Sequence, residues 1–111
     1  MDIFEYFNEL GPDTLSHALH WAYGPEMQSV GPLKSGLKGL DKGFHTFGFE
    51  WTEKNYAFYI DGLKFFEVNE GISKIDQYII LSMEIRDKLE GFKKAVAPDT
   101  FKIDYVKVYK K

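Results

Sequence analysis

Apolar and polar positions alternate with a period of two over much of the chain, a pattern typical of strands that bury one face. Residues 45–51 and 56–61 show this alternation, residues 63–68 form the expected returning strand, and Asp61-Gly62 separates the last two runs. Glycine tolerates the positive φ that a type I′ turn requires, so Asp61-Gly62 indicates a tight hairpin. The pattern therefore predicts an antiparallel meander of three strands.

The same alternation predicts a strand over residues 78–85, and further strands are expected over residues 2–7, which are strand-like, and 101–109, whose alternation slips near Tyr105-Val106. We expect long loops over residues 24–43, which are rich in Gly and Lys, and over residues 86–100. The first strand begins at the front of the chain with no turn or cap before it, so we expect an N-terminally truncated domain. The predicted fold class is all-β, an antiparallel β-sandwich.

Composition indicates one small domain and argues against several function classes. The 111 residues suffice for a single core, whereas β-sandwiches commonly have ~200–250 residues. The net charge is −3 and basic residues are scattered, so we expect no nucleic-acid partner. No apolar run approaches the ~18 residues of a membrane helix, and we expect no membrane partner. The absence of Cys excludes disulfides and thiolate chemistry.

Five motifs occur in a consistent order along the chain. They are Met1-Asp2-Ile3-Phe4-Glu5-Tyr6, His20-Trp21, the strand-like segment over residues 43–52 (GFHTFGFEWT), Phe58-Tyr59-Ile60-Asp61-Gly62, and the segment over residues 103–109 (IDYVKVY). Together they resemble glycoside hydrolase family 16, which includes laminarinases, β-glucanases and agarases. The resemblance covers nearly the whole chain but only the C-terminal half of a family domain, so residues 1–111 are expected to be a partial domain. It implies a concanavalin A-like jelly roll.

The first motif resembles the family signature Glu-x-Asp-x-x-Glu, with its first Glu falling immediately before Met1. The resemblance implies a retaining mechanism in which the absent Glu is the nucleophile, Glu5 the general acid/base and Asp2 an assisting acid. In a regular strand Asp2 and Glu5 would point to opposite faces. One β-bulge, which inserts an extra residue, returns Glu5 to the face of Asp2. The alternative is that both acids are solvated charges near a chain end.

The three histidines are expected on different faces of their strands, according to their parity. His20 has the parity of Ser16 and Ala18, so it points into a cleft near Glu5 if Leu19 and its neighbours face the core. There it could hydrogen-bond the acid/base or the substrate, or it could be satisfied by backbone groups. His17 and His45 share the parity of apolar neighbours, and we expect structural roles for both.

Four more residues are candidates for the cleft. Trp21 and Trp51 could stack on sugar rings, although their parity favours packing in the core. Ser82 and Glu84 point away from the predicted core face and could bind sugar hydroxyls, or form an exposed polar face. The family pattern after this strand is replaced here by residues 86–88 (Arg-Asp-Lys), which leaves the substrate open.

Asp104 matches a family position that often binds structural calcium, and the alternative is a solvent-facing strand residue. Calcium takes six to eight oxygen ligands. No cofactor is expected to be required for catalysis.

The resemblance implies an endo-acting glycosidase for a β-linked polysaccharide, with a β-1,3-glucan favoured. Extracellular location and a monomer at full length are expected from the family, and residues 1–111 carry no signal peptide pattern. Without the nucleophile the chain itself is expected to be inactive. The main alternative is a lectin-like β-sandwich that binds carbohydrate without cleaving it; a structural domain without a ligand is the other.

Overall fold

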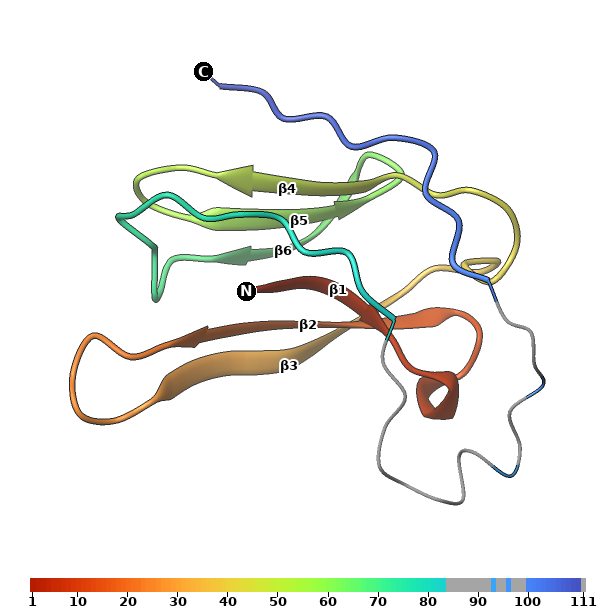
Figure 1. Ribbon diagram of the computed structural model, residues 1–111, viewed down its shortest axis with the longest axis horizontal. Helices are drawn as coiled ribbons and strands as arrows, with labels where there is room; N and C mark the ends of the chain where they lie inside the picture. The colour runs from red at the N-terminus through yellow and green to blue at the C-terminus, as the bar shows by residue number, and fades with distance from the viewer. Residues whose placement is uncertain (84–92, 94–95, 97–99, 111) are drawn as a thin grey trace. The chain divides into compact units, whose positions relative to one another are not determined.

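The computed structural model describes residues 1–83, 93, 96 and 100–110. The chain divides into two compact units, Met1–Asp76 and Gln77–Lys111. The first unit contains two antiparallel three-stranded sheets, ordered β1-β2-β3 and β4-β5-β6 (Figure 1). In chain order its elements are β1 (Asp2–Tyr6), the 3-10 helix η1 (Asn8–Leu10), β2 (Thr14–Trp21), β3 (Gln28–Gly36), β4 (Phe47–Trp51), β5 (Tyr56–Ile60) and β6 (Leu63–Val68).

The two sheets pack face to face around one apolar core. Leu19 of β2 lies with Tyr56 and Phe58 of β5 and Val68 of β6 in a single buried cluster. The three larger members, Leu19, Tyr56 and Phe58, are at most 1% exposed, so their burial stabilises the pairing of the sheets by roughly 1.5–3 kcal/mol per side chain. This arrangement confirms the predicted all-β antiparallel sandwich.

The predicted meander is present as β4, β5 and β6, paired in sequence order. Asp61 and Gly62 join β5 to β6 with φ values of 50° and 79°, as the type I′ turn requires. Tyr56, Phe58 and Ile60 all face the core, whereas Tyr59 between them is only half-buried. Alternation therefore predicted the core-facing residues of this strand, but not the burial of Ala57, which has the opposite parity and is 3% exposed.

The prediction of a loop over residues 24–43 was wrong for its middle part, which forms β3 and pairs with β2. Polar residues and glycine disfavour a strand locally, but hydrogen bonding to β2 and the contacts of Val30 and Leu33 with the core outweigh that preference. The ladder shifts register near Gly31, whose φ is +123°. A Cβ there would lie 2.8 Å from the carbonyl oxygen of His17, so only glycine allows this close approach.

In the second unit, residues 77–83 and 100–110 form no strand, contrary to the predicted strands over residues 78–85 and 101–109. A strand requires a hydrogen-bonded neighbour, and among the described residues both sheets consist of β1–β6 alone. The apolar residues Ile79 and Val108 are 53% and 77% exposed, so the alternation here does not bury a face. Most of the predicted loop over residues 86–100 lies outside the described residues.

Candidate functional site

The two acids of the first motif lie on one face of the β1-β2-β3 sheet. Asp2 pairs with Ala18 and Glu5 pairs with Ser16, so a step of three residues on β1 faces a step of two on β2. Residues directly opposite one another in a ladder share a face, and Ser16 and Ala18 have the same parity on β2. The bulge predicted from the spacing of Asp2 and Glu5 is therefore confirmed.

Contacts on the core side of the sheet hold the bulge in place. The ring of Phe4 stacks on Phe47 of the other sheet, with centroids 4.0 Å apart. The imidazole of His17, which is 2% exposed, hydrogen-bonds the carbonyl oxygen of Ile3 through Nδ1. Because a carbonyl can only accept, Nδ1 carries the proton. Phe4 and His17 thus hold the backbone segment that separates Asp2 from Glu5.

His17 is neutral in this environment. Burial lowers its pKa, and the hydrogen bond to Ile3 only partly opposes that effect. Its second nitrogen, Nε2, lies 2.7 Å from the hydroxyl oxygen of Ser35 and accepts the hydroxyl proton once Nδ1 is the donor. His17 has the structural role that its parity predicted. That this role includes anchoring the bulge was not evident from sequence.

His20 lies beside Asp2, with Nε2 3.5 Å from Oδ2. The side chains are 50% and 39% exposed, so both are accessible from solvent. Sequence reasoning had placed His20 near Glu5, and the register explains the difference. Asp2 lies opposite Ala18, two residues from His20, whereas Glu5 lies opposite Ser16, four residues from it, or ~13 Å along the strand.

Asp2, Glu5, Ser16, Ala18 and His20 lie on one face of the sheet, which we call the acid face; within it Ser16 and Ala18 are buried. It points away from the β4-β5-β6 sheet, because Leu19, with the opposite parity on β2, belongs to the core.

Two residues of β3 also lie on the acid face. Lys34 pairs with Ser16, and Ser29 pairs with His20. Sequence reasoning missed both because it predicted a loop over residues 24–43. Their place becomes apparent only from the pairing of β3 with β2. Lys34 brings a cationic group to the same face as Glu5, separated from it by the single strand β2.

Three further candidates belong to the second unit. Ser82 is exposed and belongs to the second unit, and Glu84 lies outside the described residues. Asp104 is also exposed in the second unit, and within the described ranges no group of three His, Cys, Asp or Glu residues could hold a metal ion. The calcium site at Asp104 therefore stays a prediction.

The tryptophans differ in their surroundings. Trp21 packs against the core, as its parity predicted, and its indole lies so close to Gly71 that a Cβ there would overlap the ring. Trp51 was expected in the core but is 39% exposed. It ends β4, which among the described strands pairs with β5 alone, and its ring centroid lies 6.0 Å from that of Tyr56.

His45 has a structural role outside the acid face, as its parity predicted. Nδ1 lies 2.7 Å from Oδ2 of Asp61, and Nε2 lies within hydrogen-bonding distance of the carbonyl oxygens of Gly39 and Lys42. The hydrogen bond with Asp61 raises the pKa of His45, and the same bond lowers the pKa of Asp61. This pair ties the loop before β4 to the β5–β6 turn.

No helix in the described part of the chain is long and apolar enough to cross a membrane. Neither a curated protein nor a solved structure matches the chain. The family model "Glycosyl hydrolases family 16" matches residues 12–107, which include β2 with His20 and the whole meander but not β1. A match over this much of the chain, together with its antiparallel β-sandwich, shows that the protein belongs to glycosyl hydrolases family 16.

Proposed function

We propose that the acid face is part of the catalytic cleft of a retaining, endo-acting glycosidase that cleaves a β-linked polysaccharide, with a β-1,3-glucan as the favoured substrate. The observation that carries this proposal is the bulge that turns Asp2 and Glu5 to one face. The bulged signature resembles the laminarinase, agarase and carrageenase branches of the family, and among their substrates we favour a β-1,3-glucan. Membership in the family supports a glycoside hydrolase in general.

Glu5 is the general acid/base and Asp2 the assisting acid. Retaining glycosidases use two carboxyl groups ~5–5.5 Å apart, one as nucleophile and one as acid/base. The family nucleophile corresponds to the position immediately before Met1, two residues before Asp2. In a strand that position shares the face of Asp2, and through the bulge the face of Glu5. Crowding of carboxylates favours protonation of one of them, which is the state a general acid needs.

His20 is a positioning residue for Asp2. Its Nε2 lies 3.5 Å from Oδ2 of Asp2, within ion-pair distance, and this contact would hold the carboxylate toward the nucleophile position. His20 is also half-exposed, so it can contact a sugar hydroxyl. Both contacts are possible because His20 lies on the acid face, on the strand that pairs with β1.

We also propose a partner, a location, the cofactor requirement and two further substrate contacts. The partner is a polysaccharide, with no nucleic acid and no membrane, and the full-length protein is an extracellular monomer. No cofactor takes part in the reaction, and a calcium ion at Asp104 would need ligands beyond the described residues. Ser82 and Glu84 are proposed to contact substrate.

The test places a carboxylate at the position that corresponds to the family nucleophile. A chain extended so that Glu stands immediately before Met1 is assayed on laminarin, mixed-linkage glucan and agarose, with the anomeric configuration of the product followed by NMR. We expect cleavage of laminarin with retention, and none by the 111-residue chain.

An extension carrying Gln in place of Glu is the matched control and should be inactive. Failure of the folded Glu-bearing chain to cleave any polysaccharide would overturn the proposal. Binding of laminarin without cleavage would instead support the lectin-like alternative.

A further inference from the structure

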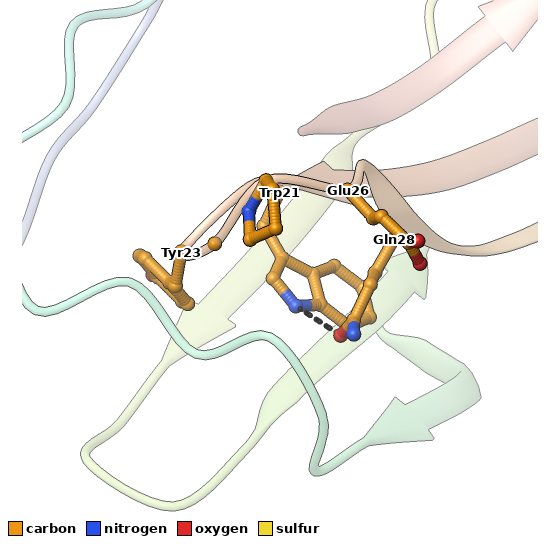
Figure 2. A pocket seen from close by; sticks show the side chains of 6 residues that line it. Trp21, Tyr23, Glu26 and Gln28 are labelled. Carbon is orange, nitrogen blue, oxygen red and sulfur yellow. Dashed lines mark hydrogen bonds between the residues drawn. The ribbon is translucent and has the colours of Figure 1, made fainter.

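Two of the turns that join paired strands differ in the chemistry of their residues. The β2–β3 turn has a hollow of about 370 Å³ beside Trp21, whose Nε1–H donates to Oε1 of Gln28 at 3.0 Å (Figure 2). Trp21 and Gln28 have the core-facing parity of Leu19, so this hollow lies on the opposite side of the sheet from the acid face. The β5–β6 turn instead presents a reactive pair, Asp61-Gly62, with the Asp61 side chain 39% exposed.

Asp61 is the only aspartate or asparagine of the sequence that is followed by glycine. In such a pair the amide nitrogen of the glycine can attack the side-chain carboxyl carbon, because glycine has no side chain to hinder the approach. A C–N bond forms, and the hydroxyl group of the carboxylic acid leaves with the amide proton as water. The product is a cyclic imide, a succinimide.

Water from the solvent then opens the succinimide at one of its two carbonyl carbons. Attack at the side-chain carbonyl restores aspartate. Attack at the former backbone carbonyl of Asp61 breaks its bond to the nitrogen of Gly62, which stays attached through the side-chain carbon. The chain then continues through the side chain as isoaspartate, with a free α-carboxylate. The water lost in the first step is regained in the second, so the mass is unchanged and nothing is oxidised.

Two hydrogen bonds hold the carboxylate of Asp61 toward the segment that enters β4. Oδ2 lies 2.7 Å from Nδ1 of His45, and Oδ1 accepts the backbone N–H of Thr46 at 2.9 Å. Gly62 lies on the other side of Asp61, at the start of β6, and β5 separates β6 from β4. Ring closure therefore requires the carboxylate to leave both donors.

The backbone of the turn is held as well. The N–H of Asp61 donates to the carbonyl oxygen of Thr46 at 2.8 Å, and Ile60 pairs with Leu63 across the turn. Ring closure needs rotation about the Cα–C bond of Asp61, which would break this pairing. The folded hairpin therefore opposes the reaction through its backbone and through the carboxylate contacts.

The ionised state of Asp61 opposes the reaction too, because a carboxylate is a poorer electrophile than a carboxylic acid. The hydrogen bond from His45, and after it the one from the amide of Thr46, lower the pKa of Asp61 and favour the carboxylate. His45 is held in position by the carbonyl oxygens of Gly39 and Lys42, which lie 3.1 and 3.2 Å from Nε2. The loop before β4 thus keeps the pair in its unreactive form.

We propose that Asp61-Gly62 is a site of isoaspartate formation that the contact between His45 and Asp61 suppresses in the folded chain. Isoaspartate lengthens the backbone of the turn, and the type and length of a hairpin turn fix the register of its strands. Modification should therefore disrupt the pairing of β5 with β6. The inference does not depend on the proposed function, because it concerns a peptide bond of the chain itself.

The test incubates the folded 111-residue chain and folded His45→Gln at neutral pH and follows isoaspartate at position 61 by peptide mapping. The modified peptide has an unchanged mass and a different retention time, and isoaspartyl methyltransferase labels it. We expect His45→Gln to form it about tenfold faster, because a charged partner favours the carboxylate more than a neutral one does. His20→Gln, whose histidine lies beside Asp2 on the other sheet, is the matched control and should react as the wild type does.

Gly31→Ala separates the local contact from general unfolding. It should destabilise β2–β3 without touching His45 or Asp61. At an equal fraction unfolded it should therefore react more slowly than His45→Gln. In urea the wild type and His45→Gln should react equally, and Gly62→Ala several-fold more slowly, because a side chain hinders the attack.

Three results would overturn the proposal. The first is an equal rate for the wild type with and without urea, which needs no variant to fold. The second is an equal rate for the folded wild type and folded His45→Gln, or for His45→Gln and Gly31→Ala at an equal fraction unfolded. The third is a chain in urea that gains no isoaspartate at position 61.

Discussion

Asp2 and Glu5 are three residues apart in the sequence but pair with residues only two apart, Ala18 and Ser16. The extra residue turns the two carboxylates to the same side of the sheet. It is held from the core side by a buried histidine and a stacked phenylalanine pair. The geometry that the proposed chemistry needs thus depends on contacts made on the opposite face of the sheet.

Glu5→Gln should remove the general acid/base without altering the bulge. In the chain that carries Glu before Met1, we expect the rate of laminarin hydrolysis to fall by about 10²–10⁴-fold, the usual contribution of acid–base catalysis. Asp2→Asn should cost less, because Asp2 assists rather than transfers the proton. Initial rates of reducing-sugar release measure both. Equal activity of Glu5→Gln and the parent would refute the assignment of Glu5.

His17→Gln should destabilise the fold and remove one source of acid sensitivity. The pKa of His17 in the folded chain is below 6.5, so below pH 6.5 the unfolded chain binds more protons and stability falls. Loss of the buried hydrogen bonds should cost about 1–3 kcal/mol at neutral pH. Urea unfolding at pH 7.5 and pH 5.0 measures both effects. The same acid-induced loss in the variant as in the wild type would contradict this account.

His45→Gln should change the pH dependence in the opposite sense. Both ring nitrogens of His45 face acceptors, those of Asp61, Gly39 and Lys42, so the charged form is favoured in the folded chain. Its pKa is raised above 6.5, so its stabilising contribution is complete below pH 6.5 and is lost as pH rises through the folded-state pKa.

The melting temperature of the wild type should therefore contain a component that declines on the alkaline side of pH 6.5. That component should be missing in His45→Gln. Thermal melts from pH 5.5 to pH 9 compare the two proteins, with His20→Gln as a control on the other sheet. A decline of equal size in all three would exclude His45 as its source.

Gly31→Ala should destabilise the β2–β3 pair. The new Cβ would lie 2.8 Å from the carbonyl oxygen of His17 at a φ of +123°, which L side chains rarely adopt. We expect a loss of about 1–3 kcal/mol. Gly36→Ala on the same strand is the control, because its Cβ would lie 3.7 Å from the nearest atom. A similar free energy of unfolding for both variants would argue against a steric requirement at Gly31.

Features that depend on near neighbours could be predicted from the sequence. The Asp61-Gly62 turn needs only residues that tolerate positive φ, and the core-facing residues of β5 need only alternation. The bulge in β1 was predicted from the three-residue spacing of Asp2 and Glu5, once the family resemblance implied that both acids share a face. In each of these cases the backbone preference or parity that determines the outcome lies within a few residues.

Features that depend on pairing between distant segments were decided by the tertiary structure. β3 has little strand propensity of its own and forms because its backbone hydrogen-bonds to β2. That pairing brings Lys34 and Ser29 to the acid face. The register of β1 on β2, rather than parity alone, places His20 beside Asp2 instead of Glu5. The alternating residues 78–83 and 101–109 have no strand among those described to pair with, so a local pattern alone did not make them strands. Alternation records which side chains share a face, but a strand exists only where another backbone satisfies its hydrogen bonds.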